Sequence, residues 1–133
     1  MLFRSNMIEK FYDNGGNMVV LNNSLSIDVK KLFNISNFSN KYGGLSGDQL
    51  FPYTEKLVES VHNKFSKLPI IACGGITNGE KVWSLLNKGA SLFEIYSGIT
   101  FKGLNLVIEI NNTLNQKLGN DSIQTFIGKR DSK

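Results

Sequence analysis

Short apolar segments alternate along this chain with longer segments whose apolar residues recur at helical spacing. The apolar segments predict strands at roughly Met18 to Leu21, Ile70 to Cys73 and Leu92 to Tyr96. The helical patterns cover about residues 6–13, 52–65, 77–88 and 104–118. Alternation of this kind predicts parallel strands joined by helical crossovers. Three strands form neither a closed barrel nor a well-covered open sheet, so we expect the rest to come from elsewhere or from a partner.

The expected helix at residues 77–88 carries signals at both ends. Thr77 and Glu80 have the spacing of a capping box, in which Thr77 caps the helix and Glu80 reaches back. Gly89 is placed as the C-terminal cap. The expected buried side of this helix consists of Val82, Trp83, Leu85 and Leu86.

A long polar stretch from Asn23 to Leu50 separates the first strand from the next helix. It shows no convincing apolar period, so we expect a loop. A loop of this length is uncommon inside a compact domain and is often functional.

Composition limits the classes of function. The chain has 133 residues, 41% of them apolar, which suffices for one domain. A net charge of +4 fits an anionic ligand, or only solubility. The basic residues are dispersed, so we expect no nucleic-acid partner. The sequence contains no apolar run near 18 residues, so we expect no transmembrane segment, and the first ten residues do not resemble a secretory signal.

Cys73 and His62 are single residues of their types. One cysteine excludes an internal disulfide and a cysteine-rich zinc site, and we expect no metal site. We expect Cys73 to be a small buried residue rather than a reactive thiol. A Ser-His-Asp triad would have to use His62, which we expect on a helix face, partly buried or solvated.

Two glycines, Gly74 and Gly75, follow the apolar run of residues 70–73 directly. Glycine permits a positive φ and close approach of a ligand, and successive N–H groups before a helix favour an anion. The alternative is a tight turn without a ligand. The next strand ends similarly at Ser97, and the following residues suit a short helix. Phosphate commonly binds after the last two strands of a (β/α)₈ barrel, beside a short extra helix.

Four motifs carry a family resemblance, "YGGLSGDQL", "PIIACGGI", "GASLFEIYSGITFKG" and "FIGKR". From about Gly15 to Arg130 the chain resembles the C-terminal part of dihydroorotate dehydrogenase, above all the quinone-linked (class 2) type. The resemblance implies an α/β protein, the FMN-dependent (β/α)₈ TIM barrel, with residues 1–133 supplying its last three strands. We therefore expect the chain to be a C-terminal fragment of an FMN-binding barrel domain.

The resemblance also implies a set of cofactor-binding residues. Gly47 matches a glycine whose backbone meets FMN. Gly74 and Gly75 match the pair that approaches the flavin phosphate, and Tyr96 and Ser97 match residues whose backbone completes the phosphate site.

Substrate contacts are implied at the end of the first strand. Asn22 and Asn23 match an Asn-Thr pair that hydrogen-bonds the orotate ring, although two asparagines at this point may serve only to end a strand. Leu21 stands where a flavin-contacting threonine is usual, and Asp48-Gln49 stand where the family usually has Lys-Pro.

The activity implied by the resemblance is oxidation of dihydroorotate to orotate in de novo pyrimidine biosynthesis. A base removes the C5 proton, hydride passes from C6 to FMN, and a quinone accepts the electrons. The family's base is a serine on an earlier loop with no counterpart here, so we assign no catalytic residue and expect the chain alone to be inactive. The implied partners are dihydroorotate or orotate, a quinone and the missing N-terminal half. A eukaryotic parent enzyme would lie at the mitochondrial inner membrane.

Two other functions remain open at this point. One is another FMN-dependent TIM-barrel oxidoreductase, against which the Asn22-Asn23 pair and the "GGLSG" loop argue. The other is a non-catalytic remnant or a subunit that only completes a partner barrel. Two further side chains have alternative roles. Glu94 is a general base, the partner of a lysine or a residue of a polar barrel layer, and Tyr96 is a stacking or a structural residue.

Overall fold

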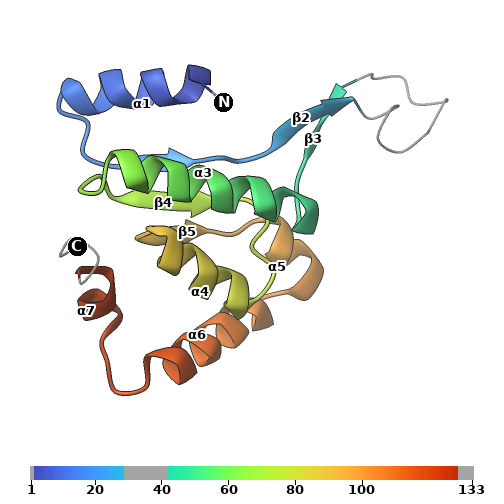
Figure 1. Ribbon diagram of the computed structural model, residues 1–133. Helices are drawn as coiled ribbons and strands as arrows, with labels where there is room; N and C mark the ends of the chain where they lie inside the picture. Colours follow the sequence, from blue (N-terminus) through green and yellow to red (C-terminus); the bar gives the residue numbers. More distant parts are fainter. Residues whose placement is uncertain (1, 29–41, 129–133) are drawn as a thin grey trace.

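The computed structural model describes residues 2–28 and 42–128. Helices and strands alternate through most of this part of the chain (Figure 1). In chain order they are α1 (Leu2–Asp13), β1 (Val19–Leu21), β2 (Leu25–Asp28), β3 (Tyr42–Leu45), the 3₁₀ turn Asp48–Leu50, α3 (Phe51–Lys64), β4 (Ile70–Cys73), α4 (Gly79–Lys88), β5 (Leu92–Glu94), α5 (Ser97–Lys102), α6 (Asn105–Leu118) and α7 (Ile123–Gly128).

The main sheet has the strand order β1-β4-β5, and both pairings are parallel. Its register places Val20, Ile71 and Leu92 in one cross-strand row, and Leu21, Ala72 and Phe93 in the next. The predicted parallel sheet of three strands is therefore confirmed. Because all three strands run the same way, the segments that follow them meet at one edge of the sheet.

The prediction of a long loop from Asn23 to Leu50 is wrong near both ends of that stretch. β2 and β3 pair antiparallel there, with Leu25 opposite Leu45 and Asp28 opposite Tyr42. Residues 29–41 of that stretch lie outside the described residues. Figure 1 shows the β2–β3 ribbon projecting beyond the end of the main sheet. Its alternating exposure, half-buried at Leu25 and Ile27 but exposed at Ser26, is the period-two pattern of a strand.

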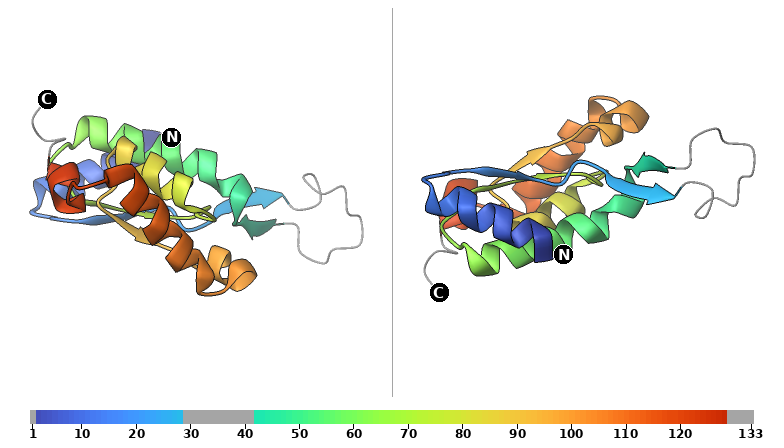
Figure 2. Two further views of the ribbon diagram at one scale, coloured as in Figure 1. Left: turned by 90° about the horizontal axis from the view of Figure 1, so that it is seen from below. Right: turned by 90° about the horizontal axis from the view of Figure 1, so that it is seen from above.

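The core lies between the sheet and its covering helices. Ile70 and Ala72 of β4 are fully buried members of this core. Figure 1 shows α3 and α4 in front of the sheet, and Figure 2 shows the same layer from below and above. Helix α1 contributes Ile8 to the core. The core residues of the other three helices recur at spacings of three and four, at Leu57, Val58 and Val61 in α3, Val82, Leu85 and Leu86 in α4, and Leu106, Ile110 and Leu114 in α6.

The two predicted caps of α4 have different outcomes. Gly89 ends the helix in the left-handed region with φ 111°, as predicted. The capping box is wrong, because Asn78 is the N-cap and its Oδ1 accepts the Lys81 N–H at 2.9 Å. The Thr77 hydroxyl instead donates to Asp48, and Glu80 pairs with Lys117. Trp83, expected in the buried side, is half-buried and packs against the core.

The opposite face of the sheet is open. Val20 is 48% exposed and Leu92 53% exposed, and they flank Ile71 in the same row. Within the described residues, β1 and β5 are also the edge strands of this sheet. The chain thus builds one helix-covered layer and leaves an apolar face and two strand edges available.

Candidate functional site

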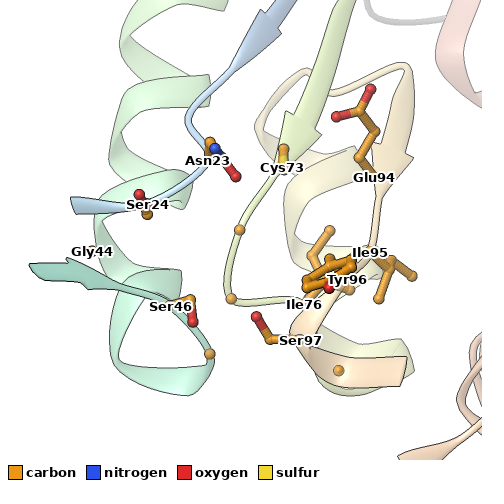
Figure 3. A pocket seen from close by; sticks show the side chains of 14 residues that line it. Asn23, Ser24, Gly44, Ser46, Cys73, Ile76, Glu94, Ile95, Tyr96 and Ser97 are labelled. Carbon is orange, nitrogen blue, oxygen red and sulfur yellow. The ribbon is translucent and has the colours of Figure 1, made fainter. Parts of the chain in front are cut away.

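A pocket of about 200 Å³ lies at the carboxyl end of the parallel sheet (Figure 3). Four segments that follow strands form its walls. They are Asn23 and Ser24 after β1, Gly44, Ser46 and Gly47 around the end of β3, Cys73 to Ile76 after β4, and Glu94 to Gly98 after β5. Six of the seven residues predicted to bind cofactor or substrate line this pocket, namely Asn23, Gly47, Gly74, Gly75, Tyr96 and Ser97.

The glycine pair after β4 has an explanation inside the chain. Gly74 and Gly75 have φ angles of 109° and 80°, which L side chains rarely adopt. A Cβ on Gly75 would lie 2.4 Å from the backbone nitrogen of Phe51, and one on Gly74 would lie 2.6 Å from Leu50 Cδ2. What approaches the pair closely is the start of α3. The two glycines are therefore required by packing, whether or not a ligand also contacts them.

Gly47 differs from this pair. Its φ of 76° also requires glycine, but a Cβ there would meet nothing within 4 Å. Gly47 therefore lines the pocket with open space beside it, and that space is available to a ligand.

Polar groups are unequally distributed in the pocket. Figure 3 shows the hydroxyls of Ser46 and Ser97 at one end, and Glu94 with Cys73 at the other. The described lining residues include no lysine or arginine. An anion at the serine end would be held by hydroxyl and backbone N–H groups, away from the Glu94 carboxylate.

Cys73 and Glu94 are register partners on β4 and β5. Cys73 is half-buried and lines the pocket, so the expectation of a buried cysteine is wrong. Burial raises the pKa of the Cys73 thiol, and the neighbouring Glu94 carboxylate raises that pKa further. The thiol is therefore protonated at neutral pH and a weak nucleophile.

Asn22 and Asn23 occupy different surroundings. Asn22 has φ 73°, and its side-chain amide donates to Thr54 Oγ1 at 2.8 Å. Thr54 is fully buried, and its hydroxyl lies 3.4 Å from the Leu50 carbonyl. Asn22 thus connects the end of β1 to α3, and it does not line the pocket of Figure 3. It lines a separate, mainly apolar cavity of about 470 Å³, together with Asn23 and residues of α1 and β1.

Tyr96 and Ser97 form the turn into α5. The Tyr96 side chain is 85% exposed, and its carbonyl accepts the N–H groups of Ile99 and Thr100 at 3.1 and 3.2 Å. The predicted short helix after the last strand is confirmed as α5. Because Tyr96 is mostly exposed, it is not a core residue.

Comparisons with known proteins show the family of this chain. The family model described as "Dihydroorotate dehydrogenase" matches residues 6–118 of this chain. The chain belongs to the dihydroorotate dehydrogenase family. The predicted motif "FIGKR", at residues 126–130, lies beyond that match, and residues 129–130 of it lie outside the described residues.

Two relatives share the name "Dihydroorotate dehydrogenase (quinone)". The protein of Bartonella tribocorum is 33% identical over 115 residues, covering 86% of this chain and 31% of the relative. That of Coxiella burnetii is 42% identical over 73 residues, covering 54% of this chain and 21% of the relative. The chain therefore spans about a fifth to a third of the length of these dihydroorotate dehydrogenases.

Solved dihydroorotate dehydrogenase structures from Eimeria tenella share the fold. The ligand-free form superposes with a TM-score of 0.74 at 22% identity, over 94% of this chain and 35% of that chain. The complex with ferulenol gives a TM-score of 0.74 at 24% identity, over 90% of this chain and 32% of that chain. The prediction of an α/β portion of a TIM barrel is confirmed.

Sequence patterns do not identify every residue that lines the pocket. Ser24, Ser46 and Gly44 line the pocket because the β2–β3 ribbon brings them there, and the sequence predicts a loop in place of that ribbon. The "GGLSG" motif is the available signal for Gly44 and Ser46.

Metal-binding clusters and membrane-spanning helices are both absent from the described ranges. Residues 2–28 and 42–128 contain no group of three or more His, Cys, Asp or Glu side chains placed to hold a metal ion. No helix in these ranges combines the length and apolarity needed to cross a bilayer. His62 is half-buried, and its ring lies where a Cβ on Gly89 would project.

Proposed function

We propose that this chain forms the C-terminal part, residues 1–133, of the FMN-binding barrel of a quinone-linked dihydroorotate dehydrogenase. The observation that carries the proposal is the convergence of Gly47, Gly74, Gly75, Tyr96 and Ser97 on one pocket. These five residues come from three separate segments of the chain, and the family motifs in the sequence predict all five as cofactor-binding residues.

The pocket fits the phosphate end of FMN. Its serine hydroxyls and glycine backbone N–H groups are donors of the kind that hold a phosphate, and the open space beside Gly47 leaves room for it. A volume of about 200 Å³ is smaller than the roughly 300–1,000 Å³ of sites that enclose a drug-sized ligand. The chain would therefore hold one end of the cofactor, and the remaining barrel strands would enclose the flavin ring.

When bound, FMN supplies the acceptor for hydride from dihydroorotate. Asn23 lines the pocket and is exposed, so its amide is available to a substrate ring. Asn22 fixes the end of β1 through Thr54 and thereby positions its neighbour. Asn22 and Asn23 would thus share the substrate role, with Asn23 facing the pocket.

The open face and edges of the sheet support a need for more strands. Val20, Ile71 and Leu92 form an apolar row of the kind that fills a barrel interior. Pairing of β1 and β5 with further strands would satisfy their exposed backbone edges. The quinone acceptor and attachment of the complete enzyme to a membrane, the mitochondrial inner membrane in a eukaryote, belong to the same proposal.

The test is dye-coupled oxidation of dihydroorotate by the purified 133-residue chain with added FMN. We expect no turnover above a flavin-only blank, because loss of a catalytic base alone costs about 10²–10⁴ in rate. Turnover above the blank that Asn23→Ala abolishes would show that the chain is catalytically complete.

Flavin content separates the alternatives. A chain that holds the phosphate end of FMN will bind added FMN weakly and lose it on dialysis. A non-catalytic remnant will show no saturable binding. A barrel-completing subunit will retain flavin only in a complex with a second chain, which size-exclusion chromatography with flavin absorbance would detect.

A further inference from the structure

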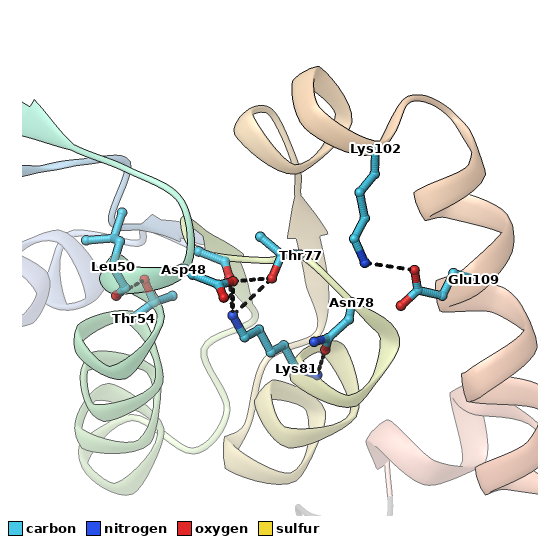
Figure 4. Close-up of polar contacts among 9 residues, drawn as sticks. Asp48, Leu50, Thr54, Thr77, Asn78, Lys81, Lys102 and Glu109 are labelled. Carbon is cyan, nitrogen blue, oxygen red and sulfur yellow. Dashed lines mark hydrogen bonds and ion pairs between the residues drawn. The ribbon is translucent and has the colours of Figure 1, made fainter.

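Lys81, on the first turn of α4, contacts three groups in the loops that precede α3 and α4 (Figure 4). Its Nζ forms an ion pair with Asp48 Oδ1 and lies 3.0 Å from Thr77 Oγ1 and 3.3 Å from the Gly75 carbonyl. The Thr77 hydroxyl donates to the same Asp48 oxygen. The Lys81 Nζ also lies 4.9 Å from the centre of the Phe51 ring.

These contacts join the two glycine-containing loops of the pocket. Asp48 follows Gly47 directly, in the loop between β3 and α3. Gly75 and Thr77 belong to the loop between β4 and α4. Lys81 bonds to both loops at once, and the Thr77 hydrogen bond to Asp48 joins the loops directly.

Lys81 is the more buried partner of its ion pair with Asp48. The Lys81 side chain is 18% exposed and the Asp48 side chain 72% exposed. Hydrogen bonds from Lys81 and then Thr77 hold the pKa of the Asp48 carboxyl below its usual value, so this carboxyl is ionised at neutral pH. Without Lys81, the Asp48 carboxylate would keep the Thr77 hydrogen bond but lose its paired cation, and its charge, one residue from Gly47, would repel an anion.

We propose that Lys81 is a positioning residue for the anion end of the cofactor, which it serves by tying the Gly47 loop to the Gly75 loop through Asp48. This inference rests on the proposed function. Lys81 does not line the pocket, so it acts through the loops and not by touching the ligand.

The variants Lys81→Met and Asp48→Ala distinguish a tie between the Gly47 and Gly75 loops from a general effect of the positive charge of Lys81 on anion binding. If the pair acts as a tie, each variant weakens binding of FMN and of inorganic phosphate about two- to fivefold, the size expected of a partly exposed ion pair. The double variant is then no weaker than the worse single variant. Asp48→Asn keeps an acceptor oxygen for Lys81 and Thr77, so it retains most of the affinity.

The matched control is Lys88→Met. Lys88 also lies on α4 and also pairs with α3, through Glu59 at 2.6 Å, but at the other end of the helix. This variant removes the same charge from the same helix, so phosphate and FMN affinity should stay at the wild-type value after correction for net charge. An equal loss in Lys81→Met and Lys88→Met would overturn the proposal, as would tighter anion binding by Asp48→Ala.

A second readout keeps the inference separate from the proposed function. The Leu50 N–H donates to the Gly47 carbonyl at 2.9 Å, so its hydrogen exchange reports the closure of that loop. We expect faster exchange at Leu50 in both Lys81→Met and Asp48→Ala, and no change in Lys88→Met. Wild-type exchange at Leu50 in all variants would refute the tie. Changed exchange without any phosphate or FMN binding would support the tie and refute the cofactor site.

Discussion

The two faces of the β1-β4-β5 sheet have opposite surroundings although the same strands make both. On one face, Ile70 and Ala72 are fully buried beneath the helices. On the other, Val20 and Leu92 are about half exposed on either side of Ile71. Alternate residues of a strand point to opposite faces, so an apolar run in both registers indicates burial on both sides. The covered face therefore stabilises the fold of this chain. The open face is an apolar surface of the kind that is usually covered by further protein.

The largest expected difference in the free energy of unfolding is between substitutions of a leucine in the covered layer and a leucine on the open face. Leu85 is fully buried in α4 and Leu92 is exposed on the open face. Leu85→Ala should reduce the free energy of unfolding by about 2–5 kcal/mol, whereas Leu92→Ala should cost less than about 1 kcal/mol. Urea unfolding followed by circular dichroism measures both. Equal losses would mean that the open face is covered in the isolated chain, for example by a second copy.

The next comparison concerns glycines on the two sides of the pocket. Gly75→Ala forces a Cβ against the Phe51 backbone at a positive φ, so we expect a loss of about 3 kcal/mol or more. Gly47→Ala meets no atom within 4 Å and should cost only the φ preference, about 1–2 kcal/mol. Thermal unfolding ranks the two.

Flavin binding by these glycine variants must be interpreted with their stability. A larger residue at Gly75 should abolish FMN binding, but displacement of α3 alone would produce that result. Gly47→Ala leaves Phe51 in place, so weaker FMN binding in this folded variant points to the pocket. Unchanged FMN affinity in Gly47→Ala would contradict a ligand contact at that residue.

The neighbouring asparagines give a smaller contrast. Asn22→Ala removes the hydrogen bond to buried Thr54 and places alanine at φ 73°, so we expect a loss of about 1–3 kcal/mol. Asn22→Gly tolerates that φ and isolates the hydrogen bond. Asn23 is exposed, so Asn23→Ala should change stability by less than about 0.5 kcal/mol. A stability loss in Asn23→Ala equal to that in Asn22→Ala would contradict the separate roles.

The sequence predicts the covered layer well, because strong local signals agree there with tertiary packing. β4, α4 and Gly89 follow from an apolar run, a helical period and a glycine cap. Six of the seven predicted site residues lie in one pocket. Parallel strands bring five of them together at their carboxyl ends, and the β2–β3 ribbon brings Gly47.

Other features depend on contacts between distant segments, and local patterns do not encode them. Thr77 and Asn78 both suit an N-cap, and Asp48 decides between them by engaging the Thr77 hydroxyl from 29 residues away. The β2 and β3 strands have four residues each, too few for a clear apolar period, so their pairing defines them. The position of Cys73 at the end of an apolar run predicts burial, but the residue lies on the open face of the sheet.

The smallest expected effect is a change in the pKa of the Cys73 thiol, on the open face, when Glu94 is replaced. Glu94→Gln removes the carboxylate that raises the Cys73 pKa, while the effect of burial remains. The pKa should therefore fall, which increases the thiolate fraction and the rate of alkylation by iodoacetamide at pH 8. Rates measured from pH 7 to 10 give the pKa in both proteins. A slower reaction in Glu94→Gln would contradict the assigned contact.

The central claim is that the carboxyl-end loops of this chain hold the phosphate end of FMN. Its most direct test is a titration of the isotopically labelled chain with FMN and, separately, with inorganic phosphate, followed by amide chemical shifts. The account predicts that both ligands shift the amides of Gly47, Gly74, Gly75 and Ser97, with little change at Lys88 or Gly89 at the far end of α4. Shifts that leave the four pocket amides unchanged at saturating FMN, or that centre on another surface, would contradict it.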